Sequence, residues 1–105
     1  MSDAFLDELR GRFRDSARTR VATMRTLLDA LETNPDDADA VRALMRHFHF
    51  FAGMGTTCGF SAVSAIGDEG EALLQRLVHE ALVPDADALA ACRRMVAQIE
   101  QELRD

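Results

Sequence analysis

The protein has 105 residues, a length that fits a single domain. Hydrophobic residues make up 48% of the chain and charged residues 29%, which is typical of a globular protein that folds in water and excludes a disordered or collagen-like chain. Eighteen acidic residues against 12 basic ones give a formal net charge of -6. This balance argues against nucleic acid as a partner, because binding to a phosphate backbone depends on clustered positive charge.

No apolar run reaches the roughly 20 residues that a membrane-spanning helix needs, and the amino terminus lacks the regions of a signal peptide. We therefore expect a cytoplasmic protein without a membrane partner. The initiating Met and the complete helical pattern favour a free-standing protein, which we expect to be a monomer. Cys58 and Cys92 belong to no CxxC motif, so both are expected in the core as thiols, with a disulfide as the lesser alternative.

The first 33 residues predict helical structure in two parts. Residues 3–15 carry apolar side chains at helical spacing and form either a separate short helix or a leading extension of the next one, with the join near Asp15-Ser16. Residues 16–33 carry an apolar stripe in steps of four and three, which is typical of a helix that faces a bundle core. The members of this stripe are Ala17, Val21, Met24, Leu28 and Leu31.

Three further helices are predicted over residues 37–57, 60–81 and 85–104. Pro35 and Pro84 mark two loops, each followed by acidic residues that suit a helix start, and Gly59 can end a helix and reverse the chain. We interpret those acidic residues as helix caps rather than metal ligands. The expected core stripes are Val41, Leu44, Met45, Phe48, Ala52 and Gly55; then Phe60, Val63, Ile66, Leu73, Leu74 and Leu77; then Leu89, Cys92, Val96, Ile99 and Leu103.

No segment alternates with a period of two, so the fold class is all-α. Short connections between the helices force neighbours to run antiparallel. The sequence therefore predicts an antiparallel up-down four-helix bundle with an additional amino-terminal helix or helix extension, forming one domain over residues 1–105. A coiled-coil dimer of longer helices is the alternative, but the prolines interrupt every candidate helix.

His49 is the candidate functional residue. On a helical projection with Phe48 at the centre of the buried stripe, His49 lies about 100° away, at the edge between core and solvent. Gly53 lies one turn further on and has no side chain, so it leaves the imidazole open to a partner. A glycine inside a helix costs about 1 kcal/mol of stability relative to alanine, which suggests that this position serves a purpose. Arg46 and Arg42 lie one and two turns earlier, within reach of an anion on the ring. This combination indicates a site for a phosphoryl group on histidine.

The run from His49 to Glu71 resembles the signature of histidine phosphotransfer (HPt) domains of bacterial phosphorelays. In that signature a His is followed by Gly at plus four, here Gly53, by Gly at plus ten, here Gly59, and by an acidic or amide residue at plus twenty-two. The resemblance implies that His49 accepts a phosphoryl group on Nε2 from the aspartyl phosphate of one receiver domain and passes it to another. It also implies that Glu71 holds the orientation of the ring.

The chain departs from the family pattern at one position. Many family members carry Lys three residues after the His, where this chain has Ala52. Neutralising the phosphoimidazole would then fall to Arg46, to Arg42 or to the partner. Phe50 projects away from the buried centre, and it either packs under the amino-terminal segment or joins a docking patch. The expected partner-binding residues are Phe50, Ala52, Gly53 and Thr56.

The resemblance implies a relay intermediate rather than an enzyme, with catalysis and Mg²⁺ supplied by the receiver and no cofactor on this chain. The implied partners are response-regulator receiver domains and a hybrid sensor kinase. The sequence has no Gly-rich loop followed by Lys-Ser or Lys-Thr, so no P-loop ATP site is expected.

Two other functions compete with the relay. One is a non-phosphorylated helical-bundle regulator that docks on a receiver domain or a histidine kinase. The other is a cofactor- or metal-holding bundle, which is disfavoured because the chain lacks the inward Glu-x-x-His pairs that such sites use. A zinc site on His47 and His49 is also disfavoured by the sequence, because the two residues lie about 200° apart around a helix. His79 is expected at the solvated surface.

Overall fold

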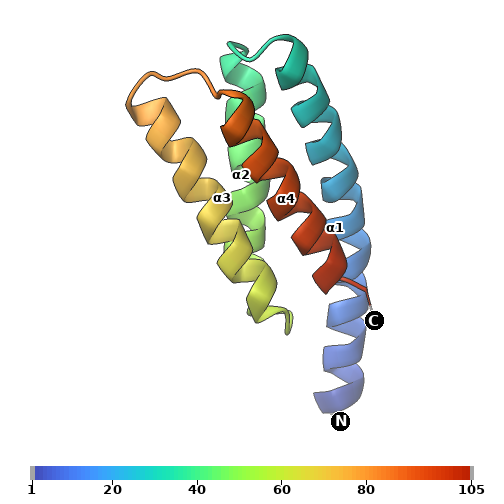
Figure 1. Ribbon diagram of the computed structural model, residues 1–105. Coiled ribbons are helices and arrows are strands. Elements are labelled where there is room, and N and C mark those ends of the chain that lie inside the picture. The colour runs from blue at the N-terminus through green and yellow to red at the C-terminus, as the bar shows by residue number, and fades with distance from the viewer. Residues whose placement is uncertain (1, 105) are drawn as a thin grey trace.

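The computed structural model describes residues 2–104, and its regular structure in that range is α-helical. The helices are α1 (Ser2–Thr33), α2 (Ala38–Met54), α3 (Ser61–His79) and α4 (Ala86–Glu102). They run up and down in turn (Figure 1), and each packs against two neighbours in the ring order α1, α2, α3, α4. The predicted antiparallel four-helix bundle is confirmed. Within residues 2–104 no helix is both long and apolar enough to cross a membrane.

The amino-terminal segment is an extension of the first long helix. α1 is continuous through Asp15-Ser16, so of the two predicted alternatives the structure shows the leading extension rather than a separate short helix. Neither Pro nor Gly interrupts the chain there, and Phe13 continues the buried stripe one turn before Ala17. The Phe13 ring packs against the rings of Phe50 and Phe60, at centroid distances of 5.9 and 5.4 Å, which holds the helix to the bundle across the expected break. The first turns of α1 project past the ends of the other helices (Figure 1).

The other helix ends lie within a few residues of the predicted ones. The carboxylates of Asp37 and Asp85 cap α2 and α4 by accepting hydrogen bonds from the backbone N–H three residues later, at 3.1 and 2.8 Å. α2 ends at Met54 rather than at residue 57, because the chain turns before α3 through Gly59. The φ of Gly59 is 88°, in the left-handed region that glycine adopts without a steric penalty.

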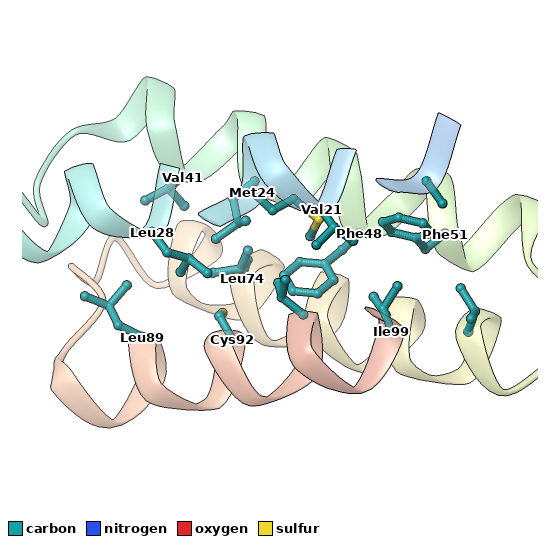
Figure 2. Packing of buried hydrophobic residues seen from close by; sticks show 14 of the residues in the cluster. Val21, Met24, Leu28, Val41, Phe48, Phe51, Leu74, Leu89, Cys92 and Ile99 are labelled. Atoms are coloured by element: carbon teal, nitrogen blue, oxygen red, sulfur yellow. The ribbon is translucent and has the colours of Figure 1, made fainter. Parts of the chain in front are cut away.

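One hydrophobic core joins all four helices. Figure 2 shows Met24 of α1 and Phe48 of α2 within it, among side chains from α3 and α4. Every member of the predicted stripes of α1 and α4 is buried, and so is Phe51, which the predicted stripe of α2 omitted. Cys58 and Cys92 are buried free thiols, as expected. Burial raises the pKa of the Cys92 thiol to about 11.

α2 and α3 form the most extensive contact between any two helices, and glycine makes it possible. A Cβ atom on Gly67 would lie 2.5 Å from the backbone nitrogen of Ala52 and 2.8 Å from the carbonyl oxygen of Phe48. A Cβ atom on Gly70 would overlap the Phe48 ring. Backbone and ring of α2 thus occupy the space that two side chains of α3 would fill. The predicted stripe of α3 skips this stretch, and the sequence analysis missed both glycines.

Ser64 is a buried polar residue in the first turn of α3, and its hydroxyl forms hydrogen bonds with the backbone at the end of α2. Its hydroxyl accepts a hydrogen bond from the N–H of Thr56 at 2.7 Å and donates one to the carbonyl oxygen of Phe51 at 3.3 Å. Gly55 leaves room for this approach, since a Cβ atom there would lie 2.7 Å from the Ser64 hydroxyl. The start of α3 therefore supplies a partner for the Thr56 N–H just past the end of α2, and adds a second hydrogen bond to the Phe51 carbonyl, which already accepts one from the Gly55 N–H.

Alanine at two of the glycines should have opposite effects on stability. Gly67→Ala places a methyl group against the α2 backbone, so we expect the free energy of unfolding to fall by about 1–3 kcal/mol through overpacking. Gly53→Ala meets open space, with no atom within 4 Å of its Cβ, and should raise stability by up to about 1 kcal/mol through helix propensity. Urea unfolding of both variants measures the difference. A Gly67→Ala protein as stable as Gly53→Ala would contradict the close packing described here.

Candidate functional site

His49 lies on the outer side of α2 and reaches across to α3. Its Nδ1 atom is 2.7 Å from Oε2 of Glu71, and this pair is the polar link between the exposed edges of the two helices. The His49 side chain is 73% exposed, whereas that of Glu71 is only 20% exposed. The carboxylate is therefore held partly inside the protein while the imidazole remains open to solvent.

The contact with Glu71 selects one tautomer of the ring. An ionised carboxylate only accepts hydrogen bonds, so the neutral imidazole donates its Nδ1–H to Glu71. The Nε2 atom then carries the lone pair and has no proton. The arrangement gives His49 a nucleophilic nitrogen on the exposed side of the ring.

Gly53 keeps the approach to this ring open. It is exposed, and no atom lies within 4 Å of the position that its Cβ would occupy. On the other side of His49, a shallow hollow of about 430 Å³ lies along α2 and α1. Its lining residues are Arg20, Ala43, Arg46, His47, His49 and Phe50.

The structure separates the two arginines that were predicted to neutralise a phosphoryl group. Arg46 is exposed and lines the same hollow as His49. Arg42 instead lies 3.9 Å from Asp39 and borders a different pocket, near the α1–α2 and α3–α4 loops. Of the two, Arg46 is the residue that shares a surface with the imidazole.

The predicted partner-binding residues lie in three different environments. Gly53 is exposed, and Ala52 is half-buried against Gly67 in the α2–α3 contact. Thr56 lies in the turn after α2 and borders a separate hollow beside the first turns of α1. Phe50 packs against Phe13 of the amino-terminal helix, which is one of the two arrangements predicted for it. It also lines the hollow next to His49.

Arg20 of α1 is the residue at this hollow that sequence analysis missed. Its guanidinium carbon lies 3.6 Å from the centre of the Phe50 ring, and its Nη1 is 3.1 Å from Nδ1 of His47. Arg20 is 29 positions before His49 in the chain, and no local spacing links the two residues. The sequence signal that could have indicated an arginine here is Phe50, because aromatic faces at the surface attract guanidinium groups.

The surroundings of His47 keep its imidazole neutral. Burial lowers the pKa of His47 below 6.5, and the neighbouring charges of Arg20 and Arg46 lower it further. Because a guanidinium only donates hydrogen bonds, Nδ1 of His47 is the acceptor in the contact with Arg20. Burial also lowers the pKa of the Arg20 guanidinium from its usual value.

His47 and His49 point to different helices, the first toward α1 and the second toward α3. In the part of the chain that the structure describes, no three His, Cys, Asp or Glu side chains are grouped closely enough to hold a metal ion. His79 is exposed at the end of α3, where it was expected.

Comparison with known proteins identifies the family and the fold. The sequence model of the Hpt domain family matches residues 8–102. A solved structure, the CheA phosphotransferase domain from Thermotoga maritima, superimposes with a TM-score of 0.84 over 93% of this chain and 92% of that one, at 24% sequence identity. At that identity the likeness establishes the shared helical fold. A comparison with curated proteins gives no match.

Because the family match spans nearly all of the chain, the protein belongs to the Hpt domain family. Membership supports histidine phosphotransfer in a phosphorelay as its function. Hpt domains are carriers of a phosphoryl group rather than enzymes in the usual sense, and they interact with receiver domains and kinases of two-component systems. The structure places His49 and Glu71 together, as the family signature implied.

The lowered pKa of His47 makes folding stability depend on pH. As the pH falls below about 6.5, unfolded chains take up a proton that the folded state resists, so the free energy of unfolding decreases. His47→Gln retains an acceptor for Arg20 and cannot titrate. We expect the wild type to lose more stability than this variant between about pH 7.5 and about pH 5.5 in urea unfolding. Equal losses in the two proteins would contradict the assignment of a neutral, partly buried His47.

Proposed function

We propose that His49 is the phosphoryl carrier of a phosphorelay, accepting the group from the aspartyl phosphate of one receiver domain and passing it to another. The observation that carries the proposal is the hydrogen bond between Nδ1 of His49 and Glu71, which leaves an unprotonated Nε2 at an exposed surface. The donor and the acceptor are taken to be response-regulator receiver domains, with a hybrid sensor kinase upstream.

In the first transfer, Nε2 attacks the phosphorus in line with the acyl oxygen. The N–P bond forms as the O–P bond breaks, and the aspartate leaves as a carboxylate. The imidazole becomes positively charged, and its Nδ1–H remains donated to Glu71, whose negative charge offsets that of the ring. In the second transfer, an aspartate carboxylate of the next receiver attacks the phosphorus, and the electron pair of the N–P bond returns to Nε2.

This chemistry requires little from the Hpt domain itself. A neutral imidazole near pH 7 is already a nucleophile, and it needs only a fixed orientation and an open approach. We assign the divalent cation, Mg²⁺, and the groups that stabilise the transferring phosphoryl group to the receiver. On this chain Arg46 is the cation that shares the hollow with His49.

Phosphorylation by a small donor tests the proposal without a protein partner. Phosphoramidate at neutral pH should add one acid-labile phosphoryl group, detected by intact mass and mapped to His49 by peptide analysis in alkaline conditions. His49→Gln should abolish the labelling and leave the fold unchanged, because the side chain is largely exposed. His79→Gln, at a second exposed histidine, is the matched control and should be labelled like the wild type.

Two results would overturn the proposal. Continued phosphate uptake by His49→Gln would place the reactive group elsewhere. If the wild-type protein stays unmodified and the His49→Gln variant still binds a receiver domain, the protein is a docking regulator that carries no phosphate.

A further inference from the structure

Arg20 is fixed beside the phosphorylation site before any partner binds. The Phe50 ring lies under its guanidinium at 3.6 Å, and His47 accepts a hydrogen bond from it at 3.1 Å. Stacking on an aromatic ring and a hydrogen bond in the plane of the guanidinium restrict a side chain that is otherwise highly flexible. A charge held in one place in this way loses less conformational freedom when it binds a partner.

The surface around Arg20 is positively charged on a protein that is negatively charged as a whole. The net charge of the chain is -6, yet no Asp or Glu occurs from residue 40 to residue 67. That stretch includes all of α2 after its first turn, with Arg42, Arg46 and two histidines. Among the residues that the structure describes, the hollow beside His49 is lined by Arg20 and Arg46 and by no carboxylate. A local positive surface on an acidic protein favours a negatively charged partner and steers it to this face.

Arg20 lies on the α1 side of α2, away from the imidazole edge that would carry the phosphoryl group. On α2, His49 faces α3, where it contacts Glu71, whereas His47 faces α1 and holds Arg20. Arg20 and His49 therefore lie on opposite margins of the exposed face of α2, with Arg46 on the hollow that both residues line. A specific protein–protein interface buries about 800 Å² on each partner, so a receiver that places its phosphoryl group on His49 would extend over this face.

We propose that Arg20 is a docking and specificity residue, which binds a carboxylate on the surface of the receiver domain beside its phosphorylated aspartate. Phe50 and His47 act through Arg20 by holding its guanidinium in place. This inference rests on the proposed function, since it requires His49 to exchange phosphate with a receiver. Arg20 contributes to the encounter and register of the two proteins and leaves the chemistry at Nε2 unchanged.

The test compares Arg20→Gln with Arg18→Gln. Arg18 lies on the same helix, is exposed, and points about 200° away, so its replacement removes the same charge from a different face. The probe is the receiver domain that exchanges phosphate fastest with phospho-His49 in a panel of purified receivers. For Arg20→Gln we expect the receiver concentration at half-maximal transfer to rise roughly threefold to tenfold, with an unchanged maximal rate. Arg18→Gln should behave like the wild type.

Two further measurements identify the role of the charge. The difference in the receiver concentration at half-maximal transfer between wild type and Arg20→Gln should shrink as salt is raised to about 1 M, because screening weakens contacts between exposed charges. Arg20→Lys keeps the charge and loses the planar stacking, so its receiver concentration at half-maximal transfer should lie between those of the wild type and Arg20→Gln. Circular dichroism and urea unfolding establish that each variant is folded.

Labelling by phosphoramidate separates this inference from the proposed function. Arg20→Gln should be labelled at the wild-type rate, because the small donor needs no docking surface. Slower labelling would overturn the docking role and place Arg20 on the phosphoryl group, and receiver kinetics equal to those of the wild type would overturn any role in transfer. A wild-type protein that is not labelled at His49 would instead overturn the proposed function, and the role of Arg20 with it.

Discussion

Gly67 and Gly70 bring α3 into backbone contact with α2, and the geometry of the His49–Glu71 pair depends on that contact. The space of the two missing side chains is taken by the Phe48 ring and the Ala52 backbone. His49 follows Phe48 in α2, and Glu71 follows Gly70 in α3. The contact that seals the core therefore also sets the Nδ1–Oε2 distance of 2.7 Å on its outer edge. A bulkier residue at either glycine would push the carboxylate away from the ring.

The hydrogen bond itself contributes little to the stability of the fold. His49 is largely exposed, and interactions of exposed polar pairs are worth about 1 kcal/mol or less. The buried apolar cluster supplies the stability and leaves the pair free to serve a positional role. A rigid core with an exposed histidine at its margin suits a family of phosphoryl carriers. The length of α1 has a related effect, because one helix carries both Phe13 into the core and Arg20 to the site.

The sequence predicted those features that depend on local spacing. The apolar stripes identified the core faces of α1 and α4, and a helical projection placed His49 at the margin of the core. The distance of 22 residues to Glu71 was interpretable because it matched a family signature. Features that depend on how helices approach one another were not predictable in this way. Gly67 and Gly70 were missed because a gap in an apolar stripe does not reveal which residue of another helix fills it.

Residues far apart in the sequence were the other source of error. Arg20 reaches the site where α1 packs on α2, with its guanidinium over the Phe50 ring against which Phe13 also stacks, and no periodicity within α1 reports that contact. Arg42 shares a helical meridian with Arg46, but its position two turns from His49 places it beside Asp39 and another pocket. The continuity of α1 was likewise decided by tertiary packing of Phe13 rather than by the polar residues at the expected join.

The hydrogen bond to Glu71 selects the His49 tautomer with a free Nε2, and the ring nitrogens report this tautomer directly. Long-range ¹H–¹⁵N correlation spectra of the imidazoles, recorded at about pH 8 where an ordinary histidine is neutral, distinguish the two tautomers. We predict a proton on Nδ1 of His49, loss of this preference in Glu71→Ala, and its retention in Glu69→Ala, a control on the exposed face of the same helix. A proton on Nε2 of His49 in the wild-type protein would contradict the account.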